Sequence, residues 1–174
     1  MNKRFQALTA GLFALAASAS FAQAAGPSDA QIAAIVVVAN TVDIEAGRLA
    51  QSKSKNAEVK KFAKLMVADH SGVNKQAVEL VTRLKVTPEE SDTSKALKQG
   101  GADMQVKLKA LKGAQFDKAY VDNEVAYHQA VLDAIDKTLI PSAKNAELKA
   151  LLVKVRPAFE AHLGHARHMQ ASMK

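Results

Sequence analysis

Ionisable side chains interrupt three apolar helical patterns in this sequence. His70 occupies the one skipped position in a run of apolar residues spaced three or four apart. Glu124 and His128 are four residues apart, so they share one face of a helix. His162 follows Phe159 by three residues and continues another apolar stripe. The spacing therefore predicts that three imidazoles and a carboxyl group face a protein core.

A fourth helical pattern, over residues 28–54, carries two acids that could join them. Glu45 continues the row of apolar residues that contains Val42, whereas Asp43 continues the row that contains Ala39. This segment is apolar over a broad arc, so periodicity does not choose between the two acids. Both are candidates for the inward position.

The chemistry of such a group is that of a metal site. A buried imidazole or carboxylate is costly unless it is paired or bound to a metal. Histidines with carboxylates suit zinc, copper or iron, whereas calcium and magnesium prefer oxygen ligands alone. Asp69 or Glu124 could also accept a hydrogen bond from an imidazole N–H. The candidate metal ligands are His70, His128, His162, Asp43, Glu45 and Glu124.

The same residues are compatible with a metal-free interpretation. Buried histidines can pair with a carboxylate, or with the hydroxyl of Tyr120 or Tyr127, and hold a core in register without metal. The chain has no Cys, and it contains no G-x-S-x-G motif for a nucleophilic serine. The sequence therefore favours a non-catalytic protein, either metal-binding or purely structural.

Four long helical patterns position these residues. They cover residues 28–54, residues 56–86 up to the stop at Thr87-Pro88, residues 114–139 and residues 145–173. The polar, Lys-rich residues 89–113 predict a connection that carries a shorter, half-exposed helix. No segment alternates as a strand does. We therefore expect an all-α four-helix bundle, an architecture that builds metal sites from facing helices.

The depth of each candidate along the bundle permits them to meet. At a rise of about 1.5 Å per residue, the candidates on all four helices fall at similar depths. This holds whether or not the long connection returns to the end where the first two helices join. The sequence therefore permits a site and leaves the direction of the third long helix open.

Residues 1–24 have the features of a secretory signal peptide. Lys3 and Arg4 precede an uncharged apolar stretch, and residues 22–24 have the small-x-small shape of a cleavage site. The remaining residues 25–174 would form one domain in the periplasm or associated with the outer membrane. No later run of apolar residues is long enough to predict a membrane-spanning helix.

The charge balance is basic, with 24 Lys+Arg against 17 Asp+Glu and a formal net charge of +7. Without Lys3 and Arg4 there remain 22 basic residues against 17 acidic ones, a net charge of +5. The lysines are spread over solvated faces with few aromatic residues between them, which argues against a nucleic-acid partner. Solubility or a peripheral association with an anionic envelope surface would account for them.

Several stretches of residues 28–170 resemble a known family. The matching stretches are Asp43-Ile44-Glu45-Ala46-Gly47-Arg48-Leu49-Ala50, Val59-Lys60-Lys61-Phe62-Ala63, Met66-Val67-Ala68-Asp69-His70, Phe116-Asp117-Lys118-Ala119-Tyr120 with His128, and Arg156-Pro157 with His162-Leu163 and Ala166. They resemble the domain of unknown function 4142 family of secreted, ferritin-like helical proteins, also described as predicted outer-membrane proteins. The resemblance implies a ferritin-like bundle in the periplasm or at the outer membrane.

This chain departs from the pattern of that family at two positions. It has Asp43 where the family commonly has Glu, and Arg156-Pro157 where the family usually has Leu-Pro. It also lacks the paired Glu-x-x-His motifs of ferritin-like di-iron centres and has Glu124-x-x-x-His128 instead. We therefore do not expect a ferroxidase or an oxygenase.

Overall fold

The computed structural model describes residues 26–173, and this part of the chain is helical without strands. Residues 1–24, where we expect a signal peptide, lie outside it. The helices are α1 (Asp29–Lys53), α2 (Ala57–Leu84), α3 (Asp92–Ala110), α4 (Gly113–Ala134), α5 (Ile140–Ser142) and α6 (Ala146–Ser172), with a π-helical turn at Ile135–Leu139. None of the helices within residues 26–173 is long and apolar enough to cross a membrane.

The helix starts follow from capping side chains. Ser28 accepts a hydrogen bond from the backbone N–H of Gln31, whose side chain accepts one from the N–H of Ser28. The side chains of Asn56 and Asn145 each accept two backbone N–H groups in the first turns of α2 and α6. These bonds satisfy donors that have no partner within the helix. The predicted helix starts near residues 28, 56 and 145 are thus confirmed.

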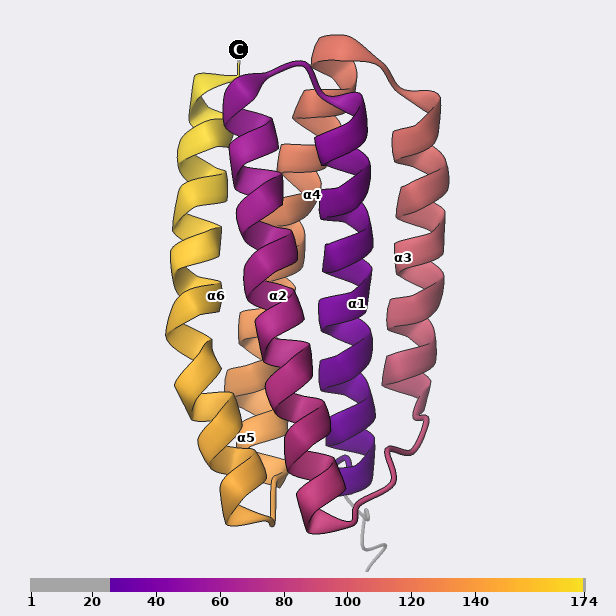
Figure 1. Ribbon diagram of the computed structural model, residues 1–174, viewed down its shortest axis with the longest axis vertical. Helices are drawn as coiled ribbons and strands as arrows, with labels where there is room; N and C mark the ends of the chain where they lie inside the picture. Colours follow the sequence, from indigo (N-terminus) through magenta and orange to yellow (C-terminus); the bar gives the residue numbers. More distant parts are fainter. Residues whose placement is uncertain (1–25, 174) are drawn as a thin grey trace, which may run out of the picture.

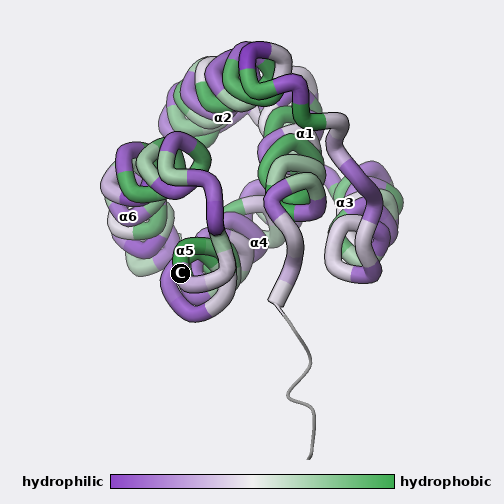
Figure 2. The backbone as a smooth tube through the Cα atoms, turned by 90° about the horizontal axis from the view of Figure 1, so that it is seen from below, coloured by the Kyte–Doolittle hydropathy of each residue, from purple (hydrophilic) through white to green (hydrophobic). Residues whose placement is uncertain are grey.

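The bundle consists of α1, α2, α4 and α6, and α3 lies outside it against α1 and α4 (Figure 2). Figure 1 shows α3 running back along the bundle, so that α4 begins at the end where α1 turns into α2. Consequently α2 and α4 run in the same direction, which the sequence left open. The all-α four-helix bundle is confirmed, and so is the half-exposed helix in the connection: α3 buries only Ser94 and Leu108.

The third predicted helix extends beyond residue 139. After α4 the chain continues through the π-helical turn into α5 and ends at Ser142. Pro141, which has no N–H to donate, lies in this continuation just after the π-helical turn. The following link is held by the Asp29 carboxylate, which accepts the backbone N–H groups of Lys144 at 2.9 Å and Asn145 at 3.0 Å.

Two apolar clusters fill the bundle. The turn-end cluster, near the α1–α2 turn, includes Phe62, Phe116 and Tyr120. The far-end cluster, toward the other end, includes Ile35 and Phe159. Between them lie buried polar side chains that we call the polar layer. The polar layer consists of Asn40, Asp43, His70, Glu124, His128 and His162.

Candidate metal centre

Three imidazoles from three helices meet in the polar layer. His70 belongs to α2, His128 to α4 and His162 to α6, and their exposed fractions are 1%, 0% and 4%. The ring centroids are 5.5 Å apart for His70 and His128, 5.3 Å for His70 and His162, and 5.4 Å for His128 and His162. One nitrogen of each ring lies within 4.8 Å of those of the other two.

Asn40 determines which nitrogen of His70 carries the proton. The side-chain N–H₂ of Asn40 donates to the carbonyl of Val36 at 2.7 Å, so its oxygen faces His70. Nδ1 of His70 lies 2.7 Å from this oxygen and must donate to it. In the neutral ring, Nε2 of His70 therefore holds the lone pair.

The rings of His128 and His162 also donate one N–H each, but to different acceptors. Nδ1 of His128 donates to the backbone carbonyl of Glu124 at 3.0 Å. Nε2 of His162 donates to the carboxylate of Asp69 at 2.8 Å. The remaining nitrogens are Nε2 of His70, Nε2 of His128 and Nδ1 of His162, and all three are buried without a hydrogen-bond partner. Such outward hydrogen bonds orient imidazoles that bind a metal.

Asp43 of α1 adds a carboxylate to the three nitrogens. Its Oδ2 atom lies 2.5 Å from Nε2 of His70 and 4.0 Å from Nε2 of His128. Because Nδ1 of His70 already holds the ring proton of the neutral form, the short contact brings two lone pairs together. A second proton on Nε2 of His70 would relieve this contact, and so would a cation bound by both atoms.

The pKa values of the polar layer favour forms of His128, His162 and Asp43 that carry lone pairs. Burial lowers the pKa of His128 to about 4, against an opposing effect of Asp43. Burial also lowers the pKa of His162. Burial raises the pKa of Asp43, but the contacts with His70 and His128 more than offset it, so the pKa of this carboxyl lies below its ordinary value. At neutral pH the layer offers two neutral imidazoles and a carboxylate.

The pKa of Glu124 is shifted in the direction opposite to that of Asp43. Its side chain is fully buried, both of its carboxyl oxygens have no hydrogen-bond partner, and one lies 3.5 Å from Nδ1 of His128. Burial and the neighbouring Asp43 raise the pKa of Glu124 well above its ordinary value. Burial and Asp43 thus favour the neutral, protonated form of Glu124. It also belongs to a second group of possible ligands, with Asp43 and His128.

The structure brings five of the six candidate ligands together and leaves Glu45 apart. Glu45 is exposed on α1, whereas Asp43 is 2% exposed within the polar layer. The two residues are about 200° apart around a helix with 3.6 residues per turn, so only one of them can face inward. Asp43 is that residue, and an inward Glu45 is wrong.

Sequence reasoning missed Asn40 and anticipated Asp69. Asn40 is 1% exposed, four residues after Val36 and three before Asp43, among the residues that α1 buries. An amide among mostly apolar residues was the signal that could have identified it. Asp69, considered as an acceptor for an imidazole N–H, does accept from His162. For His128 the acceptor is the backbone carbonyl of Glu124 rather than a carboxylate.

Comparison with protein families identifies the chain. Residues 14–169 match the family model described as "Domain of unknown function (DUF4142)". The chain belongs to this family. The match spans nearly the whole bundle of this DUF4142 protein, including every residue of the polar layer. No curated protein matches the sequence.

Two solved structures are similar to this DUF4142 protein. One is a protein described as secreted, DUF305 from Streptomyces coelicolor, with 15% sequence identity and a TM-score of 0.71, covering 83% of this chain and 93% of that chain. The other is CopM in the Cu(II)-bound form, with 13% identity and a TM-score of 0.68, covering 86% of this chain and 99% of that chain. At these identities the likeness shows a shared fold.

Proposed function

We propose that this protein binds one transition-metal ion inside its bundle. The ligands are Nε2 of His70, Nε2 of His128, Nδ1 of His162 and a carboxylate oxygen of Asp43. The observation that carries the proposal is the direction of the hydrogen bonds: each imidazole donates outward and leaves its second nitrogen buried without a partner. Unpartnered buried polar atoms are costly, and a cation bound by the three imidazoles, whose ligand nitrogens lie within 4.8 Å of one another, would satisfy them, with Asp43 beside His70 and His128.

The donor set narrows the choice of metal. Three imidazole nitrogens and one carboxylate oxygen suit zinc, copper or iron in the divalent state. Among these, the Irving–Williams order places Cu²⁺ as the most tightly bound. CopM, which shares the fold, is described in a Cu(II)-bound form. We therefore rank copper first, with zinc and iron as the other metals to test.

A metal-free role is the competing proposal, and one contact favours it. A proton between Nε2 of His70 and Oδ2 of Asp43, 2.5 Å apart, would join the two residues as an ion pair without metal. The layer would then hold four helices in register and do nothing else. This alternative predicts that added metal does not change the stability of the protein.

The proposed place of action is the bacterial envelope. Residues 1–24 have the sequence features of a signal peptide, and the similar DUF305 structure is described as a secreted protein. We propose that the mature chain is periplasmic, with a peripheral association at the outer membrane. Fractionation of cells that produce the full chain, with immunodetection of the processed form, tests this location.

Metal binding is tested with protein purified without a His tag and stripped with a chelator. Addition of Cu²⁺, Zn²⁺ or Fe²⁺ should give one bound ion per chain by elemental analysis and should raise the melting temperature. A metal present at 100 times its dissociation constant adds about 2.7 kcal/mol to the free energy of unfolding. His162→Gln should abolish both effects, and His168→Gln, an exposed histidine on the same helix, should leave them intact. Unchanged melting with all three metals would favour the structural alternative.

A further inference from the structure

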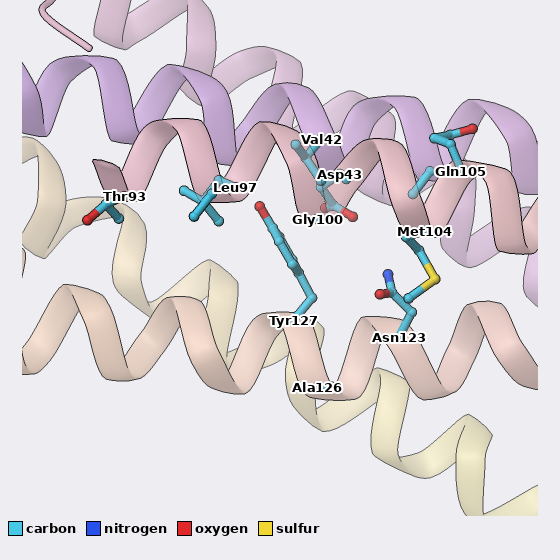
Figure 3. A pocket seen from close by; sticks show the side chains of 13 residues that line it. Val42, Asp43, Thr93, Leu97, Gly100, Met104, Gln105, Asn123, Ala126 and Tyr127 are labelled. Carbon is cyan, nitrogen blue, oxygen red and sulfur yellow. The ribbon is translucent and has the colours of Figure 1, made fainter. Parts of the chain in front are cut away.

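A groove of about 600 Å³ lies between α1, α3 and α4 and includes the polar layer's Asp43 among its lining residues. Figure 3 shows this groove, with Leu97, Gly100 and Met104 on the α3 side and Asn123 and Tyr127 on the α4 side. Asp43 is 2% exposed, and both of its carboxylate oxygens have no hydrogen-bond partner. The groove is therefore lined in part by a buried carboxylate, which is in contact with His70.

Two glycines lie on the face that α3 turns to the bundle, between larger apolar residues. Leu97, Gly100, Gly101 and Met104 recur at the spacing of one helix face. A Cβ atom at Gly101 would lie 2.7 Å from a methyl group of Val42, so the glycine permits the close approach of α3 to α1. At Gly100, in contrast, a Cβ atom would meet no atom within 4 Å. The space beside Gly100 is open.

The charge of the lining distinguishes this groove from its neighbours. Asp43 is its one charged lining residue. A second groove, between α3 and α4, carries Lys107 and Lys118 beside Asp122, and a third, between α2 and α6, carries Arg83 and Lys154 beside Glu79 and Glu147. On a basic protein, a groove without Lys or Arg that is lined in part by a carboxylate attracts cations, because surface charges raise or lower the local concentration of ions.

We propose that the groove beneath α3 is the passage through which the metal ion reaches the polar layer, with Asp43 as its first ligand inside the protein. This proposal depends on the proposed function. An ion at the Asp43 carboxylate is next to Nε2 of His70 and faces Nε2 of His128. Asp43 thus connects the groove to the imidazoles, and a hydrated divalent cation is the ligand class that this lining suits.

Blocking the groove tests the passage. Gly100→Leu places a side chain in the open space without a clash of its Cβ atom, and Ala126→Leu enlarges a lining residue on α4. Gly72→Leu and Ala161→Leu are the matched controls, because neither Gly72 nor Ala161 lines the groove and Gly72 also has open space around it. Melting temperatures of the metal-free variants establish that each protein is folded.

The readout uses the chain's own fluorescence. The protein has 2 Tyr and no Trp, and the rings of Tyr127 and His128 are 6.1 Å apart, so Cu²⁺ at the site should quench tyrosine emission. Stopped-flow mixing of metal-free protein with Cu²⁺ alone gives the association rate, and titration against a competing chelator gives the affinity.

We expect both groove variants to associate with Cu²⁺ at least ten times more slowly, with affinities within threefold of that of the unmodified protein. The two controls should bind at the unmodified rate. Unchanged association rates in folded Gly100→Leu and Ala126→Leu would overturn the passage while leaving the metal site in place. A failure of the unmodified protein to bind Cu²⁺, Zn²⁺ or Fe²⁺ at all would overturn the metal site and the passage together.

Discussion

The polar layer and the two apolar clusters that flank it are formed by the same helices, but the layer buries ionisable side chains where the clusters bury apolar ones. In the turn-end cluster, side chains such as Phe62 and Tyr120 are fully buried and stabilise the fold by leaving water. In the polar layer, His128 and Glu124 are equally buried, yet Nε2 of His128 and both Glu124 carboxyl oxygens lack hydrogen-bond partners. Apart from the unpartnered hydroxyl of Tyr120, the clusters can therefore be understood from the burial of apolar surface, whereas the layer requires either a proton or a cation.

The first test removes apolar bulk from the turn-end cluster. Phe62→Ala should lower the free energy of unfolding by about 3–5 kcal/mol, because the ring's contacts are lost and a cavity remains. The residue is 0% exposed and packs edge-on against Tyr120 at a centroid distance of 6.3 Å. Chemical denaturation measures the loss. The folded fraction should still bind metal with unchanged stoichiometry, since no ligand is removed. If the folded variant no longer bound the metal ion, the turn-end cluster would also be needed for metal binding, and the contrast between cluster and layer would fail.

The second test uses pH on the metal-free protein. His128 has a pKa of about 4 in the fold against an ordinary value of 6.5, so the unfolded chain binds the extra proton between these values. Its contribution to stability is present above pH 6.5 and is lost as the pH falls toward 4. Glu124 opposes this: its raised pKa means that its contribution is present at low pH and is lost as the pH rises above 4.5.

Glu124→Gln should remove that opposition. The free energy of unfolding of this variant should rise between pH 4 and 6.5 by up to about 1.4 kcal/mol per pH unit for each proton taken up on unfolding. The unmodified protein should show a shallower slope. Denaturant titrations across this pH range measure both slopes, and identical slopes would mean that Glu124 is ionised in the fold.

The third test removes one ligand. His70→Gln should weaken metal binding by at least about 100-fold, which corresponds to about 2.7 kcal/mol. Competition with a chelator of known affinity measures the loss. The exposed His168 provides the control, since His168→Gln changes the same residue type outside the layer. Equal affinities for the two variants would remove His70 from the ligand set.

The fourth and smallest effect concerns the orientation of His70. Asn40→Ala removes the acceptor that holds Nδ1 of His70, and metal affinity should fall by about 10- to 100-fold. Asn74→Ala is the matched control, because the side chain of Asn74 donates to Val37 and Thr41 rather than to a histidine. If both variants bind metal equally well, the hydrogen bond from His70 to Asn40 does not orient the imidazole for metal binding.

The sequence predicted the helices and most of the layer because both follow from local spacing. Heptad-like apolar positions and capping residues such as Ser28 and Asn56 act within a few residues along the chain. The imidazoles of His70 and His162 were placed inward by the same spacing. These predictions needed no knowledge of how the helices associate.

Features that depend on packing between helices could not be predicted from local spacing. The direction of α4 is fixed by the return of α3 along the bundle, and the rise per residue gives similar depths for either direction. The choice of Asp43 over Glu45 depends on which arc of an apolar helix faces its neighbours. The role of Asn40 required the position of His70, which lies 30 residues further along the chain.

The most direct test of the central claim is nitrogen NMR of the histidine rings in the protein loaded with Zn²⁺. Long-range correlations between ¹⁵N and the ring protons identify which nitrogen of each imidazole binds the metal. The hydrogen bonds of the polar layer predict coordination through Nε2 of His70 and His128 and through Nδ1 of His162. Rings that remain uncoordinated in the presence of Zn²⁺, or that bind through the nitrogens now donating outward, would contradict the account.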